Sequence, residues 1–184
     1  MALTEQDLQS RARRAYEWAR LRRATAALPL LLLAIASAAF GARPGLSMAI
    51  GAGLVTWGSF SLWLGHGLDR ALLPGVVAGL APLLLVTCAT RVDHVCLGAA
   101  CRSVCLAASL LGGGAAGLFV GRWAAQKGAN LAMAGGAAGS ALLTGSLACS
   151  CIGLHGLAAI TATFLTMAPL SWALSNRAPS AKDP

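Results

Sequence analysis

The chain has 184 residues, of which 57% are hydrophobic and only 11% are charged. A soluble globular domain carries roughly 25% charged residues, so this composition excludes an ordinary soluble domain and indicates an all-α transmembrane bundle. The net charge is +8, and in a membrane protein such an excess indicates topology and contact with anionic lipid. We therefore expect a lipid bilayer as partner and no direct contact with nucleic acid.

Residues 1–23 form the one clearly polar segment, which we expect to be a cytosolic basic amphipathic helix. Thr4 and Asp7 have the spacing of a capping box, and six arginines follow before residue 24. Three interpretations are open. The helix lies on anionic lipid, it serves only as the positive flank of the first span, or it binds a cytosolic partner. The residues that would contact such a partner are Leu8, Arg11, Arg14, Tyr16 and Trp18.

Six apolar segments follow, each close to the ~20 residues that a helix needs to cross a bilayer. We predict a six-helix transmembrane domain over 24–175 and a short disordered cytosolic tail over 176–184. The predicted spans are 24–41, 46–68, 71–90, 103–121, 129–149 and 152–174.

The Lys and Arg residues in the connections set the expected orientation. With six spans, eleven of the fourteen fall on the side of the N-terminal segment and three fall on the other side. The positive-inside rule then places both termini in the cytoplasm, as in a multi-pass protein of the bacterial inner membrane. The loop over 91–102 and the turn near Cys149 would face the periplasm, where disulfides persist.

Glycines recur at four-residue intervals in three of the spans. Small residues at this spacing let helix backbones approach closely within lipid. We expect them to pack one bundle internally rather than to form a dimer seam. The pairs or series are Gly75 with Gly79, then Gly113, Gly117 and Gly121, and finally Gly135 with Gly139.

All six cysteines lie in two short stretches, 88–105 and 149–151. Cys88 is expected to be a packing residue. The other cysteines lie near chain turns on the predicted outer face, where their thiols can be oxidised or can bind a metal ion. The candidate sensing or redox residues are Cys96, Cys101, Cys149 and Cys151.

Two pairs of these side chains have the spacing that places both members on one helix face. Cys101 and Cys105 are four residues apart, as are Cys151 and His155. Thiolate and imidazole are the preferred ligands of Zn²⁺ and Cu⁺, so the pairs predict a metal site at the outer ends of neighbouring spans. His94 is a further candidate ligand, and a disulfide between the two stretches is the alternative.

In layout and in two local stretches the chain resembles the NrsF-type membrane anti-sigma factors of proteobacteria. The stretches are Cys96-Leu97-Gly98-Ala99-Ala100-Cys101-Arg102-Ser103 and the glycine-rich fifth span that ends in Leu147-Ala148-Cys149-Ser150-Cys151 before His155. The resemblance implies that segment 4–23 holds an extracytoplasmic-function sigma factor at the membrane. It also implies that Cys96 or Cys101, with Cys149 or Cys151, signals its release. Ser150-Cys151-Ile152 replaces the proline and acid that commonly follow the family's second cysteine.

The sequence thus predicts a regulator that senses metal or oxidant stress, and not an enzyme. A membrane thiol-disulfide oxidoreductase linked to quinone is one alternative, although the chain has no Cys-x-x-Cys pair. A soft-metal transporter is the other, although the thiols gather at one end rather than along a pathway.

Overall fold

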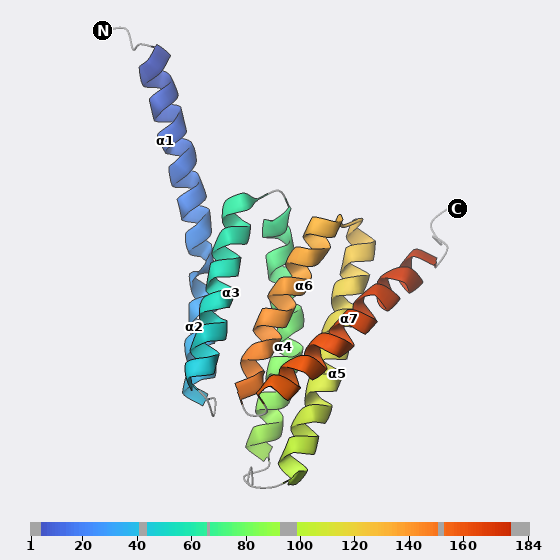
Figure 1. Ribbon diagram of the computed structural model, residues 1–184. Helices are drawn as coiled ribbons and strands as arrows, with labels where there is room; N and C mark the ends of the chain where they lie inside the picture. The colour runs from blue at the N-terminus through green and yellow to red at the C-terminus, as the bar shows by residue number, and fades with distance from the viewer. Residues whose placement is uncertain (1–4, 41–43, 66, 93–98, 151–152, 178–184) are drawn as a thin grey trace.

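The computed structural model describes residues 5–40, 44–65, 67–92, 99–150 and 153–177. Over these ranges the chain is all-α, as predicted (Figure 1). The elements are α1 (Glu5–Ala24), η1 (Thr25–Ala27), α2 (Leu28–Phe40), α3 (Pro44–Leu64), α4 (Leu68–Val92), α5 (Ala99–Lys127), α6 (Leu131–Ser146), η2 (Leu147–Ser150) and α7 (Leu154–Arg177). The two η elements are short 3₁₀ turns.

The second predicted span, 46–68, ends four residues earlier than expected. Helix α3 begins at Pro44, whose fixed φ suits the first turn of a helix, and it ends at Leu64. Gly65 then takes φ 65° and donates its N–H to the Ser61 carbonyl at 3.1 Å. This left-handed residue closes the helix, because a glycine has no Cβ to oppose that conformation.

Helix α5 is longer than predicted at both ends. The expected loop between Arg122 and Gly128 is helical as far as Lys127, and Cys101 lies within the helix rather than before it. Gly128 takes φ 58°, and Asn130 caps the next helix by accepting a 2.8 Å hydrogen bond from the Met133 N–H. A single left-handed glycine and a cap therefore suffice to reverse the chain.

The exposed surface of the helices identifies a multi-pass membrane protein. Five helical segments are long and apolar enough to cross a bilayer, namely Arg11–Ala39, Pro44–Leu64, Leu68–Cys88, Ser103–Lys127 and Leu154–Arg177. Large leucines such as Leu32, Leu73 and Leu111 are 70–71% exposed, which only a hydrocarbon solvent makes favourable. Helix α6 spans about 24 Å and η2 adds about 8 Å. Together they match the ~30 Å hydrocarbon thickness, consistent with the predicted fifth span.

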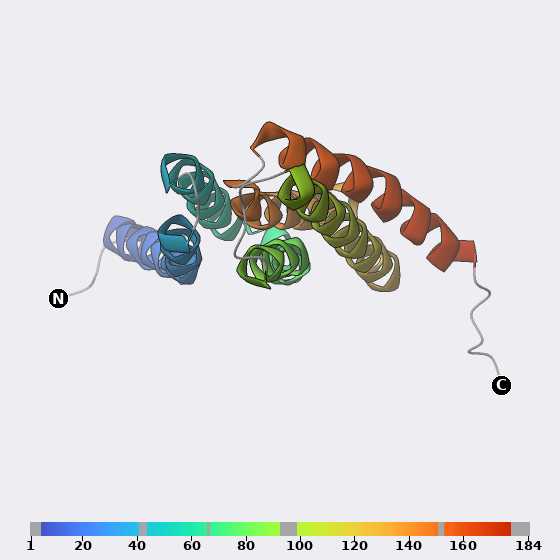
Figure 2. The ribbon, with the colours of Figure 1, turned by 90° about the horizontal axis from the view of Figure 1, so that it is seen from below.

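The helices pack as three pairs that lie side by side (Figures 1 and 2). Helix α2 pairs with α3 on one side, α4 pairs with α6 in the centre, and α5 pairs with α7 on the other side. One buried cluster joins the first two pairs and a second joins the last two. The first contains Ala27, Leu30, Leu54, Leu83, Val86, Leu147 and Ala148. The second contains Ala71, Ala78, Ala116, Val120, Ala137, Ala141 and Phe164.

Glycine contacts explain the close approach of α4 to α6 and of α5 to α7. A Cβ on Gly79 would lie 2.6 Å from the Ala141 carbonyl oxygen, and one on Gly117 would lie 2.8 Å from the Phe164 carbonyl oxygen. These glycines therefore pack within one chain, as predicted. Gly135 is the exception: a Cβ there would have no neighbour within 4 Å, so the predicted close contact is absent at this position.

Candidate functional site

The two ends of the bundle carry different chemistry. The end of α4, the start of α5 and η2 lie together at one end, which we name the cysteine end (Figure 1). Helix α1, the α3–α4 and α5–α6 turns and the end of α7 lie at the opposite end, which we name the basic end. The described parts of both cysteine stretches thus share one end of the bundle, because the two helices between them, α5 and α6, run in opposite directions.

Cys105 is the one cysteine that the structure places in a helix interface with its side chain described. It is 2% exposed and lies four residues before Ser109, at the start of the four-residue series that continues through Gly113 and Gly117. These glycines pack against Ile160 and Phe164 of α7, respectively. Helical spacing therefore places Cys105 on the face of α5 that meets α7, near the beginning of α7.

The other predicted cysteine-end residues are only partly covered by the described structure. Cys101 lies in the first turn of α5 and Cys149 lies in η2, each with its backbone alone described. His155 is exposed and Cys105 is buried, but the partner of His155, Cys151, and the side chain of Cys101 lie outside the described structure, so both predicted pairs stay predictions. Cys88 is an exposed free thiol. Among the side chains that are described, no three His, Cys, Asp or Glu residues form a metal-sized group, and Cys96, Cys151 and His94 lie outside the described residues.

At the basic end, α1 projects beyond the bundle (Figure 1). Every residue from Arg11 to Ala19 is exposed. Arg20 joins the helix to the rest of the protein, because its Nε and Nη2 donate to the Trp63 carbonyl at 3.1 and 2.8 Å. Its Cζ also lies 4.8 Å from the Trp63 ring centroid and 5.4 Å from that of Tyr16. In the sequence Arg20 is one of six arginines within residues 1–23, and nothing in its spacing separates it from the others.

The predicted partner-binding residues divide between two faces of α1. At roughly 100° per residue, Leu8, Arg11, Arg14 and Trp18 fall within one third of the helix circumference. Tyr16 falls on a different side, with Arg20 against α3. We call the first group, joined by Arg22, the free face of α1. Trp18 is 71% exposed there.

Helix α3 links α1 to the centre of the bundle. The Trp57 Nε1–H donates to Ser140 Oγ on α6 at 3.2 Å, and Ser140 donates in turn to the Gly136 carbonyl at 2.9 Å. One turn before Trp57, Leu54 is fully buried in the cluster that also contains Leu147 of η2. The sequence offered no signal for this α3–α6 contact beyond the presence of a tryptophan.

A series of contacts therefore runs from the cysteine end to Arg20 of α1. Cys149 lies in η2, which continues from α6. Helix α6 bonds to α3, and Trp63, the penultimate residue of α3, bonds to Arg20. No family model, curated protein or solved structure matches this chain.

Proposed function

We propose that the protein is a membrane-bound regulator of the anti-sigma-factor kind, which holds a cytosolic protein on α1 and releases it when the cysteine end meets a metal ion or an oxidant. The observation that carries this proposal is the position of α1. It is a 20-residue helix that extends beyond the bundle and exposes a face with several arginines and one tryptophan.

The composition of the free face favours a protein partner over simple lipid contact. A helix lying on a bilayer places its apolar side in the membrane plane, yet α1 continues through η1 into the axis of α2 (Figure 1). Tryptophan and arginine are the residue types enriched in the centres of protein interfaces. Arg11, Arg14 and Arg22 call for acidic groups opposite them. We therefore propose an acidic groove on an extracytoplasmic-function sigma factor as the binding partner.

The cysteine end is the proposed sensor. Cys101 lies in the first turn of α5, and Cys149 lies in η2, which follows directly from α6. Zn²⁺ or Cu⁺ bound by thiolates would draw these segments together. A disulfide would do the same, with the two thiols giving two electrons and two protons to a peroxide-type oxidant. Either change alters the position of α6, and α3 follows through the Trp57–Ser140 hydrogen bond.

Capture from cells tests the partner. The full-length protein, carrying a C-terminal tag, is crosslinked in unstressed bacteria, purified in detergent and analysed by mass spectrometry. We expect a sigma factor to be recovered with the wild type and lost with Arg11→Gln/Trp18→Ala. Arg122→Gln is the matched control, since Arg122 is exposed at the same end of the bundle but lies on α5. Recovery of no cytosolic protein, or equal recovery with the free-face variant, contradicts the proposal.

Release from the complex tests the sensor separately. Zn²⁺, Cu⁺ or peroxide is added to membranes that hold the crosslink-free complex, and the released partner is measured. Cys101→Ser and Cys149→Ser are expected to abolish release, whereas Cys88→Ser preserves it because Cys88 lies on an exposed side of α4. Undiminished release from both Cys101→Ser and Cys149→Ser would refute the cysteine sensor. It would not affect the proposal that α1 binds the partner.

A further inference from the structure

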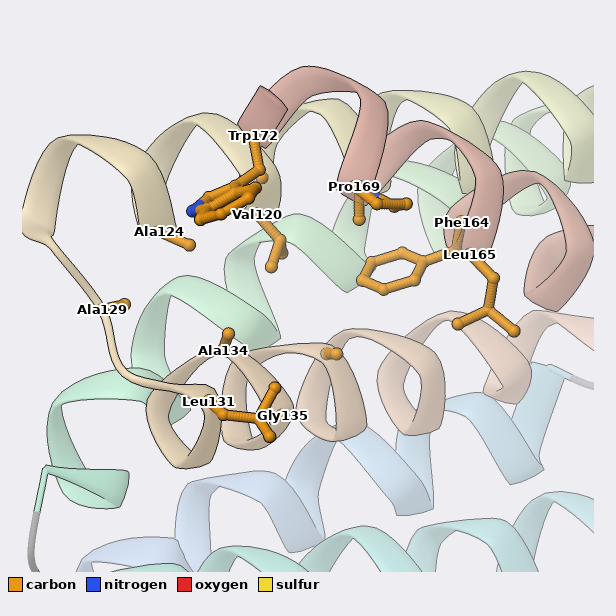
Figure 3. Close-up of a pocket in the computed structure, with 13 residues that line it drawn as sticks. Val120, Ala124, Ala129, Leu131, Ala134, Gly135, Phe164, Leu165, Pro169 and Trp172 are labelled. Carbon is orange, nitrogen blue, oxygen red and sulfur yellow. The ribbon is translucent and has the colours of Figure 1, made fainter. Parts of the chain in front are cut away.

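A second feature of the bundle is a cavity between α5, α6 and α7 near the basic end (Figure 3). Its volume is about 470 Å³. Side chains of α7, among them Phe164, Leu165 and Trp172, form one side, and Leu131 and Gly135 of α6 form the other. The cavity falls within the range of roughly 300–1,000 Å³ that small-molecule sites occupy.

The cavity exists because α7 packs along α5 and diverges from α6. Successive glycines hold α7 against α5, with Gly117 at Phe164 and Gly121 at Ala168. Helix α7 therefore tilts away from α6 as it approaches the basic end (Figure 1). On α6, Ala134, Gly135 and Ala138 are too small to fill the space that results. The open Cβ position of Gly135 is part of this space.

The lining selects hydrocarbon. All lining side chains are apolar, with the indole N–H of Trp172 as the one side-chain hydrogen-bond donor among them. A site without polar partners does not hold ordered water. The lining belongs to helices whose exposed faces contact lipid, so a lipid acyl chain is the apolar molecule at hand. The cavity is too small for a second helix, whose diameter with side chains is about 10–12 Å.

One basic residue lies beside the same end of the cavity. Lys127 is exposed in the last turn of α5, two residues before the lining residue Ala129. Arg122, in contrast, falls on the opposite side of α5 from the lining residues Val120 and Ala124. The interfacial position suits Trp172, which belongs to the residue type that gathers at headgroup depth. Hydrocarbon lining with positive charge at one end complements a molecule that has an acyl chain and a negative headgroup.

We propose that this cavity binds one acyl chain of an anionic phospholipid, with the headgroup at Lys127. The lipid replaces the missing α6–α7 contact and stabilises the tilt of α7. This site is separate from the free face of α1 and does not depend on the proposed regulatory function.

Native mass spectrometry of the detergent-purified protein tests the site. Phosphatidylglycerol and phosphatidylcholine are added to delipidated protein at equal concentrations. We expect one phosphatidylglycerol to be retained by the wild type. Gly135→Leu fills the cavity, so this variant is expected to retain no phosphatidylglycerol. Gly53→Leu is the control, because Gly53 is exposed on α3, away from the cavity.

Charge removal tests the headgroup contact. Lys127→Gln is expected to lower the preference for phosphatidylglycerol roughly fivefold, since a basic residue near an anionic headgroup contributes a factor of about five. Phosphatidylglycerol with a photoreactive acyl chain, bound to the unmodified protein, should crosslink to α7 between Phe164 and Trp172. This measurement decides the question even if Gly135→Leu folds poorly. Equal retention by Gly135→Leu, crosslinks confined to other helices, or displacement of lipid by a second copy of the chain would each overturn the proposal.

Discussion

The guanidinium of Arg20 caps the C-terminus of α3 by donating twice to the Trp63 carbonyl, at 3.1 and 2.8 Å. The last four carbonyls of a helix have no partner within that helix, and the helix dipole makes this end negative. Trp63 is the penultimate residue of α3, so Arg20 supplies both the missing donor and the opposite charge. A residue of the projecting helix thereby fixes the direction of α1 relative to the bundle.

Replacing Arg20 by Ala should loosen this junction. A hydrogen bond to a charged group contributes about 1.5 kcal/mol at the lower end of its range, which corresponds to roughly tenfold faster amide exchange. We expect that increase in the last turn of α3, measured by hydrogen exchange with mass spectrometry. Arg13→Ala is the control, since its 3.2 Å pair with Glu17 is exposed and its loss should leave α3 unchanged. Unaltered exchange in Arg20→Ala would show that other contacts hold α1.

Two neighbouring glycines of α5 should respond in opposite ways to alanine. A Cβ on Gly117 would lie 2.8 Å from the Phe164 carbonyl oxygen, so Gly117→Ala should cost about 1–3 kcal/mol through overpacking. A Cβ on Gly114 would lie 3.9 Å from its nearest neighbour, Met167 Cγ. Gly114→Ala should therefore be neutral, or stabilising through better helix propensity. Thermal unfolding in detergent measures both, and equal Tm values for the two variants would contradict the described α5–α7 packing.

Cys88 and Cys105 should differ in reactivity. Cys88 is exposed near the end of α4, whereas Cys105 is 2% exposed in the α5 interface. We expect N-ethylmaleimide to modify Cys88 at least about tenfold faster in the folded protein, because Cys105 requires local opening of the bundle first. Timed labelling followed by digestion and mass spectrometry measures the two rates. Their convergence after denaturation is the internal control, and similar rates before denaturation would place Cys105 at an accessible surface.

The orientation of the protein in the membrane can be mapped at two exposed glycines, one at each end of the bundle. Gly128 lies in the turn between α5 and α6, at the basic end, and Gly45 lies in the first turn of α3, at the cysteine end. A Cys substituted at each position, in a background without the native cysteines, is labelled in intact cells by a membrane-impermeant maleimide. The positive-inside rule predicts that Gly45→Cys is labelled and that Gly128→Cys is protected. The reverse pattern would place the native cysteines in the cytoplasm and remove the periplasmic sensor.

The helical elements were accessible from the sequence because their causes are local. Apolar length predicted the spans, and the gap between the predicted spans 46–68 and 71–90 predicted the α3–α4 turn. The boundaries moved where one residue's conformation decided them, as at Gly65, which ended α3 four residues early. The candidate metal ligands remain a prediction. Spacing placed Cys101 with Cys105 and Cys151 with His155, but spacing within one helix says nothing about which neighbour the shared face meets.

The sequence by itself determined that this chain is an all-α membrane protein, because hydrocarbon solvent requires apolar helices that satisfy their own backbone hydrogen bonds. It also determined which positions permit close contact, because glycine has no side chain to prevent it. Only the tertiary structure decided which helices meet. It paired α5 with α7, attached α1 to α3 through Arg20, buried Cys105 and left Gly135 facing a cavity. These outcomes depend on contacts between residues far apart in the chain, and a pattern along one helix does not specify its partner.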